Sequence, residues 1–210
     1  MIHEILPVGQ LQCNCSIFGD EEKREAMVID PGDDIPEIQA ILKRHQLTVS
    51  RIVFTHAHFD HIGRASILKA DTGAPTFMHK SEVPVWETLP QQAAWMGGPP
   101  PEKVVIDNFI EEGDTISFGG ADFQILFTPG HSPGSVSLYI PNENKIVGGD
   151  VLFQGSVGRT DLPGADHQTL LNSIKTRFLP LDDTVTVIPG HGPLTTIGRE
   201  RQWNPFLQNL

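Results

Sequence analysis

The chain has 210 residues, of which 39% are hydrophobic and 20% charged, and this composition is typical of a globular protein with one buried core. Its formal net charge of −11 argues against a nucleic-acid partner, because phosphate binding needs a basic surface. No apolar run approaches the roughly 18 residues of a membrane-spanning helix, and the N-terminus lacks the pattern of an export signal. We therefore expect a cytoplasmic protein without a membrane partner, present as a monomer or a small homo-oligomer.

Apolar runs typical of β-strands recur along the chain. They cover residues 2–8, 15–19, 26–30, 51–55, 75–78, 122–128, 135–140, 145–148 and 184–188. Helical patterns lie between them. One begins near Asp34 with Pro36 in its first turn, and another runs from a capping Asp166 to Phe178. The third, residues 81–95, is interrupted by prolines. Strands interspersed with helices predict an α/β or α+β layered fold.

Two further features bear on domain organisation and redox chemistry. Cys13 and Cys15 point to the same face of a predicted strand, so we expect small, half-buried side chains without a disulfide. The stretch "MGGPPPEK" at 96–103 resembles a linker, but neither side of it carries a complete set of motifs. We interpret it as a surface loop inside a single domain.

Metal-ligand residues follow four of the predicted strands. The motif "HAHFDH" at 56–61 follows "RIVFT", His131 follows "FQILFTPG", Asp150 follows "KIVGG", and His191 follows "TVTVIPG". A layered sheet presents groups from several strand ends at one edge. The repeated "PGH" fits this placement, because proline cannot continue a central strand and glycine permits a sharp turn. Four strand ends with the same character predict a shared site.

The spacing of these donors predicts two metals rather than one. If the chain leaves its strand as a tight loop that enters a helix, His56 and His58 project to one side, and Asp60 and His61 to an adjacent side. A structural zinc site needs only four ligands and is usually rich in cysteine, whereas seven nitrogen and oxygen donors suit two ions with open positions. The predicted ligands are His56, His58 and His131 for one ion and Asp60, His61 and His191 for the other, with Asp150 bridging.

The donor chemistry narrows the choice of metal. Imidazole nitrogen and carboxylate oxygen suit zinc, iron or manganese rather than calcium or copper(I). We expect two divalent ions in each chain, with zinc first and iron or manganese as alternatives. A site of this kind performs chemistry, and it predicts an enzyme.

The segments "FTHAHFDHIG", "FTPGHSPGSVSLYI", "GGDVLFQGSVGRTDLPG" and "VIPGHGPLTT" resemble the metallo-β-lactamase superfamily, and within it the glyoxalase II-like hydrolases. The resemblance implies a four-layer αββα sandwich of two mixed β-sheets with helices on the outer faces. It also implies the same seven ligands and the same assignment to two metals. Residues 1–210 are then one metallo-β-lactamase-like domain without the C-terminal helical domain of full-length glyoxalase II, as in the short bacterial branch.

Departures from other members of the superfamily support this choice. True β-lactamases usually carry cysteine where Asp150 stands, and they have export signals. Flavodiiron domains place glutamate where His58 stands. The nuclease members carry additional domains, and the acidic balance of this chain disfavours them.

The resemblance implies hydrolysis of a thioester, first of all an S-2-hydroxyacylglutathione such as S-lactoylglutathione. A hydroxide bridging the two metals would attack the thioester carbonyl. We expect Asp60 and Asp150 to be catalytic, Asp60 as a ligand that also orients the hydroxide. Arg159 aligns with a basic residue that contacts glutathione and could hold a substrate carboxylate; an ion pair with Asp161 is the equal alternative.

Two other functions remain open. Persulfide dioxygenases resemble this sequence closely and use one iron, whose ligands here would be His56, His131 and Asp150. A metal-binding module without catalysis, acting as a partner protein, is the third reading. His79 is the remaining histidine that we would examine beside the metal ligands.

Overall fold

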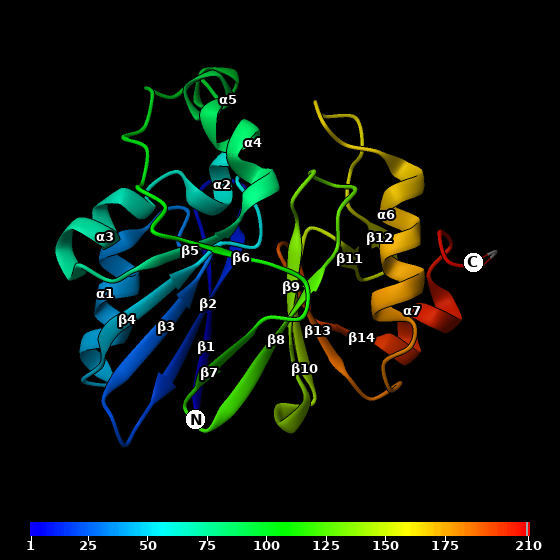
Figure 1. The fold of residues 1–210 in the computed structure, drawn as a ribbon, viewed down its shortest axis with the longest axis horizontal. Coiled ribbons are helices and arrows are strands. Elements are labelled where there is room, and N and C mark those ends of the chain that lie inside the picture. Colours follow the sequence, from blue (N-terminus) through cyan, green and yellow to red (C-terminus); the bar gives the residue numbers. More distant parts are fainter. Residues whose placement is uncertain (209) are drawn as a thin grey trace. The chain divides into compact units, whose positions relative to one another are not determined.

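The computed structural model describes residues 1–208 and 210, and it divides into two compact units. The first unit comprises residues 1–110 and 117–120, and the second comprises residues 111–116 and 121–210. Two large mixed sheets with helices, coloured along the chain in Figure 1, make up the described residues. The predicted fold class is confirmed.

The first sheet has the order β1-β2-β3-β4-β5-β6. Its first three strands are antiparallel neighbours, and β3 to β6 run parallel to one another. The strands are β1 (Ile2–Val8), β2 (Cys13–Asp20), β3 (Glu25–Ile29), β4 (Thr48–Val53), β5 (Thr76–His79) and β6 (Asn108–Ile110). The helices of this part of the chain are α1 (Ile35–Arg44), α2 (Phe59–Ile62), α3 (Ala65–Thr72), α4 (Val83–Glu87) and α5 (Leu89–Trp95), with a 3-10 turn at Lys80–Glu82.

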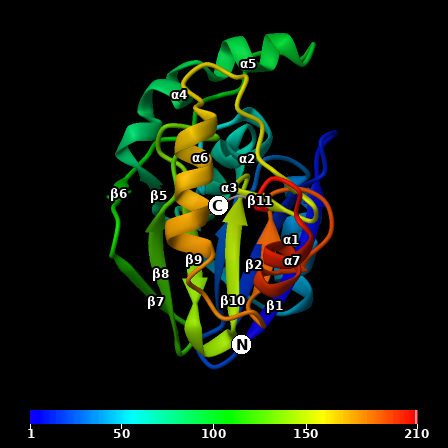
Figure 2. The same ribbon diagram turned by 90° about the vertical axis from the view of Figure 1, so that its right-hand side faces the viewer.

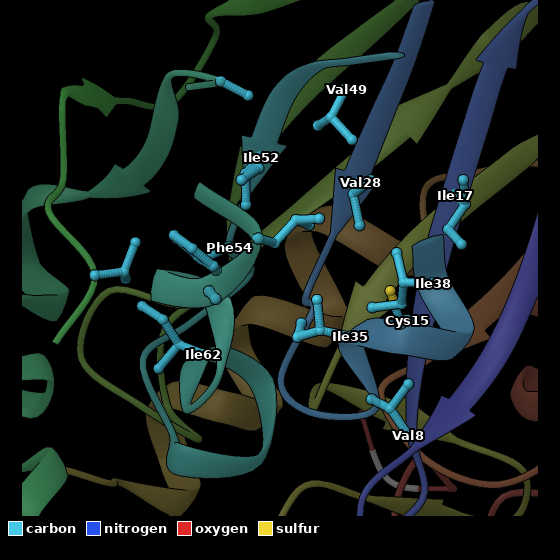
Figure 3. Close-up of a cluster of buried hydrophobic side chains, with 14 of the residues drawn as sticks. Val8, Cys15, Ile17, Val28, Ile35, Ile38, Val49, Ile52, Phe54 and Ile62 are labelled. Carbon is cyan, nitrogen blue, oxygen red and sulfur yellow. The ribbon is translucent and has the colours of Figure 1, made fainter. Parts of the chain in front are cut away.

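The core of the first unit includes buried residues of this sheet and of helix α1, together with residues of α2, α3, α4 and α5. The stripe predicted for the helix is buried, since Ile35, Ile38, Ile41 and Leu42 all pack inward. Figure 3 shows Ile35 and Ile38 beside Cys15, Ile17 and Val28 of the sheet. Burial of an isoleucine side chain contributes about 1.5–3 kcal/mol, so this contact fixes the helix on the sheet.

The second sheet has the order β14-β13-β10-β9-β8-β7. Its strands are β7 (Thr115–Phe118), β8 (Ala121–Phe127), β9 (Val136–Ile140), β10 (Lys145–Gly149), β13 (Thr186–Pro189) and β14 (Thr195–Thr196). A separate hairpin pairs β11 (Leu152–Phe153) with β12 (Ser156–Val157). The helices are α6 (His167–Ser173), which continues as a π-helical turn at Ile174–Phe178, and α7 (Ile197–Trp203), and Pro141–Glu143 forms a 3-10 turn.

Strand direction in the second sheet decides where its loops meet. Strand β9 is antiparallel to both β8 and β10, and β10 is parallel to β13. Strands β8, β10 and β13 therefore run in one direction, and their carboxyl ends lie at the same edge of the sheet. Helix α6 covers a face of this sheet (Figure 2), where Leu170, Ile174 and Phe178 join a buried cluster with Ile146 and Val187.

Several expectations are confirmed and some need correction. Asp166 caps α6 by accepting a hydrogen bond from Thr169 N at 2.7 Å. Residues 96–103 form an irregular loop inside the first unit, as expected. The region 81–95 is not one helix, because the prolines open two separate short helices, α4 and α5. Both cysteines are free, as predicted, but they are fully buried rather than half-buried.

None of the helices formed by residues 1–208 is long and apolar enough to cross a membrane.

Candidate metal centre

Four of the predicted ligands lie on one short segment of the first unit. Strand β4 ends at Val53, and the chain passes through His56 and His58 before helix α2 begins at Phe59. Asp60 and His61 lie in that helix, as the predicted loop-to-helix passage requires. His56 and His61 are buried, whereas His58 and Asp60 are partly exposed.

Neighbouring members of these four side chains lie close enough together to bind the same metal ion. The ring of His56 lies 4.7 Å from that of His58 and 4.0 Å from that of His61, measured between centroids. His61 Nε2 lies 3.7 Å from Asp60 Oδ2. Two donors about 2.1 Å from one tetrahedral ion are about 3.4 Å apart, so the separation fits ligands of a single metal better than a direct hydrogen bond.

Asp30, which our sequence reasoning did not identify, holds the two buried histidines in place. Its Oδ1 accepts from Thr55 N at 2.8 Å, and its Oδ2 accepts from the Thr55 hydroxyl at 2.6 Å and from His61 Nδ1 at 2.9 Å. Because the single Thr55 proton is donated to Asp30, its oxygen accepts from His56 Nδ1, which lies 3.0 Å away. Both histidines therefore carry their proton on Nδ1 and present Nε2 as the ligand atom.

The signal for Asp30 was present in the sequence. It directly follows strand β3, the parallel neighbour of β4, in the same way that the other site residues follow their strands. Asp30 ends the apolar run "AMVID", so the same criterion, a polar residue at the end of a predicted strand, indicates Asp30 as well.

Two side chains from the region of α4 and α5 hold the backbone of the ligand segment. Glu82, which is fully buried, accepts from Ala57 N at 2.8 Å, and Gln92 Oε1 accepts from Phe59 N at 2.8 Å. Nothing in the spacing of the sequence indicates these two contacts. Gly32 supports the same segment, because a Cβ at this position would collide with the backbone oxygen of Asp60.

The other three predicted ligands follow three strands of the second unit. His131 follows β8, Asp150 follows β10, and His191 follows β13, and these are the strands whose carboxyl ends share one edge. In the first "PGH", Gly130 has a φ of 131°, and a Cβ there would overlap the backbone of Leu170. Glycine is therefore required for the turn that brings His131 to this edge.

Asp150 lies between the two histidines of this unit. Its Oδ2 is 3.5 Å from His131 Nε2 and 3.6 Å from His191 Nε2. Both separations match those of two donors on one ion, and a single carboxylate reaches both histidines. The ring of His131 is oriented by its Nδ1, which donates to the backbone oxygen of Arg159 at 2.9 Å. The chemistry and spacing of this donor set fit the metals expected.

Arg159 itself forms an ion pair with Asp161. The guanidinium donates from Nε to Oδ1 at 2.7 Å and from Nη2 to Oδ2 at 2.8 Å. These hydrogen bonds raise the pKa of Arg159 and lower the pKa of Asp161 to about 2. The ion pair that the sequence offered as an alternative is thus observed, and substrate binding by Arg159 stays a prediction.

The remaining histidines have local partners. His3 stacks on Phe18 with 4.0 Å between ring centroids, and His45 pairs with Glu4 at 2.8 Å. His79 Nδ1 accepts from Ser81 N at 3.2 Å and so caps the turn after β5. His167 Nδ1 lies 3.4 Å from the Thr160 hydroxyl.

Comparisons with known proteins show relatives that cover nearly the whole chain. The chain is 41% identical to hydroxyacylglutathione hydrolase GloC of Haemophilus influenzae, over 98% of either chain. Among solved structures it is similar to BLEG-1, a B3 metallo-β-lactamase, with 40% identity, a TM-score of 0.91, and coverage of 99% of this chain and 100% of the other. It is also similar to TTHA1623, solved in a di-iron-bound form, with 39% identity, a TM-score of 0.88, and coverage of 97% and 100%.

The family model of the metallo-β-lactamase superfamily matches residues 8–191 of the chain. This range includes all seven predicted ligands. This fold implies a dinuclear metal site with histidine and aspartate ligands. The chain therefore belongs to the metallo-β-lactamase superfamily, and it is a metallo-hydrolase.

Proposed function

We propose that this metallo-hydrolase cleaves thioesters of the S-2-hydroxyacylglutathione class, with S-lactoylglutathione as the first candidate. The observation that carries this proposal is the similarity to hydroxyacylglutathione hydrolase GloC, which extends over nearly the whole of both chains. The location that we propose is the cytoplasm, where glutathione is kept reduced.

We propose that the chain binds two divalent ions. One would be held by His56, His58 and His131, the other by Asp60, His61 and His191, and Asp150 would be a ligand of both. The nitrogen and oxygen donors support zinc first, with iron or manganese as alternatives, and TTHA1623 is a relative that binds two irons. The Nδ1 hydrogen bonds of His56, His61 and His131 support this assignment, because each leaves Nε2 as the donor atom.

The residues of the chain orient the reacting groups. When bound, the two ions lower the pKa of water and polarise the thioester carbonyl. Asp60, whose side chain is 19% exposed, accepts a hydrogen bond from the attacking water and fixes its direction. A cysteine thiol has a pKa of about 8.5, so the departing thiolate is a weak base and can leave without being protonated first. Arg159 remains a proposed contact for a substrate carboxylate, which would have to compete with Asp161.

Hydrolysis of β-lactams is a second candidate. BLEG-1, named a B3 metallo-β-lactamase, is 40% identical over 99% of this chain. The amide of a strained four-membered ring and a thioester are both carbonyl groups open to attack by water, so one centre can act on either. We favour the thioester because GloC, which is similar over nearly the whole of both chains, is named a hydroxyacylglutathione hydrolase.

A substrate panel tests these alternatives. The protein, purified with its metals, is assayed with S-lactoylglutathione, with a chromogenic cephalosporin, and with glutathione persulfide while oxygen consumption is recorded. We expect cleavage of the thioester, with a kcat/KM at least about a hundredfold above that for the β-lactam, and loss of activity in His131→Ala. Preference for the β-lactam would favour the second candidate, and oxygen consumption would favour a mononuclear iron dioxygenase.

A further inference from the structure

A pocket of about 220 Å³ adjoins the ligand segment within the first unit. Asp60 forms part of its wall, so the pocket opens directly beside a proposed metal ligand. Pockets that enclose a whole drug-sized molecule measure about 300–1,000 Å³. This one is smaller, and it suits one end of a substrate whose reactive bond lies at the metals.

Arg64 provides the positive charge of this pocket. Its backbone N donates to Gly32 O at 2.9 Å, which fixes the start of helix α3. Its guanidinium forms no hydrogen bond or ion pair with any residue that the structure describes, although the side chain is partly buried. A guanidinium has five N–H donors in a fork that matches a carboxylate. Arg64 thus differs from Arg159, whose fork is paired with Asp161.

Asp33 provides a negative charge in the same pocket. Its Oδ1 accepts from Asp34 N at 2.9 Å, which orients the carboxylate. Among the residues described, Asp33 and Arg64 form no ion pair with each other, and the third charged residue of the pocket, Asp60, is assigned to a metal ion. The other carboxylate oxygen of Asp33 suits a cationic donor such as an ammonium group.

Apolar side chains complete the wall. Leu11 and Met96 line the pocket and are 49% and 42% exposed, and Phe59 lies beside Asp60 at the start of α2. These groups can cover the methylene carbons of a ligand whose charged end reaches Arg64 and Asp33.

We propose that this pocket binds a zwitterionic amino-acid group on the thiol half of the substrate, with the α-carboxylate on Arg64 and the α-ammonium on Asp33. The γ-glutamyl end of glutathione is such a group. The inference rests on the proposed thioester hydrolase function and extends it, because it names the side chains that recognise the thiol.

Three thioesters that share the lactoyl group test the assignment. The first is S-lactoylglutathione. The second has glutaryl in place of γ-glutamyl and so lacks only the ammonium group. The third is the thioester of N-acetylcysteinylglycine, which lacks the whole amino-acid end but keeps the glycine carboxylate.

Matched variants then separate the two contacts. Arg64→Gln should raise KM about tenfold for the first two substrates, equivalent to about 1.4 kcal/mol, and leave the third and kcat unchanged. Arg64→Lys, which keeps the charge but loses the fork, should have a smaller effect. Asp33→Asn, which keeps the oxygen that accepts from Asp34 N, should raise KM for the first substrate only. Lys43→Gln removes an exposed charge from α1 of the same unit and should change nothing.

Calorimetric binding of S-methylglutathione gives a readout independent of turnover. Arg64→Gln should weaken binding about tenfold, equivalent to about 1.4 kcal/mol, while binding of S-methyl-N-acetylcysteinylglycine stays the same. Equal effects of Arg64→Gln on all three thioesters, or no effect on any of them or on binding, would overturn the assignment. If the wild-type protein cleaves none of the thioesters, the proposed function fails, and the calorimetry alone then decides for or against the pocket.

Discussion

At the scale of single residues, the three buried histidines are oriented through Nδ1 by three different oxygens. His56 donates to the Thr55 hydroxyl, His61 to the Asp30 carboxylate, and His131 to a backbone carbonyl. Only the carboxylate adds a negative charge, and it also accepts the Thr55 proton that directs His56. Asp30 therefore controls two ligands at once, although we expect it to bind no metal itself.

Replacement of Asp30 by alanine should weaken metal binding and destabilise the fold. We expect a 10- to 100-fold loss of metal affinity, about the effect of removing such a partner, and a fall of about 1–3 kcal/mol in the free energy of unfolding. Competition with a chelator and urea denaturation measure the two effects. Asp71→Ala is the control: it removes an exposed carboxylate on α3 that accepts a hydrogen bond from Gln39 at 2.7 Å, so metal affinity should not change and the free energy of unfolding should fall by less than about 0.5 kcal/mol. Unchanged metal affinity in Asp30→Ala would contradict the role assigned to this residue.

The ion pair between Arg159 and Asp161 should affect the titration of Asp161. Hydrogen bonding to Arg159 lowers the pKa of Asp161 from 3.8 to about 2. Because the folded-state pKa is depressed, the pair contributes stability above pH 4 and loses it as the pH falls toward 2. Carbon-13 NMR titration of Asp161 should therefore give a midpoint near 2 in the wild type and a higher one in Arg159→Gln. Identical midpoints in both proteins would show that the pair does not persist in solution.

At the scale of elements, helix α5 fixes the ligand segment, residues 56–61, through hydrogen bonds of Gln92. Gln92 accepts from Phe59 N, and its Nε2 donates to Val85 O at 3.0 Å and to the Thr88 hydroxyl at 3.1 Å. One side chain thus links the start of α2 to the turn between α4 and α5. The backbone N–H at the start of α2 has no partner within its own helix, so this contact satisfies a group that would otherwise need one.

Gln92→Ala should lower the free energy of unfolding by about 1–3 kcal/mol, because it leaves buried polar groups without their partners. Gln91→Ala offers a matched control, since Gln91 is the same residue type on the same helix but is exposed. That substitution should change stability by less than about 0.5 kcal/mol. Urea denaturation of both variants measures the difference, and equal effects would argue against this role of Gln92.

The burial of strand β2 predicts that its two cysteine thiols react slowly. Burial raises the pKa of the Cys13 thiol to about 12 and that of Cys15 well above its usual range. Since the thiolate is the reactive form, both should resist a disulfide reagent at pH 8 in the native protein and react fully in denaturant. Rapid modification of the native protein would show that β2 opens far more readily than its complete burial indicates.

Periodicity predicted every strand of five or more residues and missed the shortest strands, together with helix α7. Strands such as β1, β8 and β9 are long enough to show alternation or a continuous apolar run. Two-residue strands such as β11 and β14 are held by pairing with neighbours, which no local pattern shows. The seven proposed ligands could be singled out because each follows a strand or lies in one dense motif, whereas Glu82 and Gln92 come from a 3-10 turn and a helix further along the chain and could not.

At the scale of the whole molecule, the donor set is divided along the chain. The first unit supplies four of the seven proposed ligands from residues 56–61, and the second supplies His131, Asp150 and His191. That residues 1–210 form one domain remains a prediction.

The metal content of the purified protein tests this account most directly. Elemental analysis of protein prepared without added metal, run beside His131→Ala and His191→Ala, counts the ions held by each chain. The account predicts about two equivalents of zinc, iron or manganese in the wild type and fewer in both variants. A single equivalent of iron, unaffected by His191→Ala, would contradict the dinuclear hydrolase.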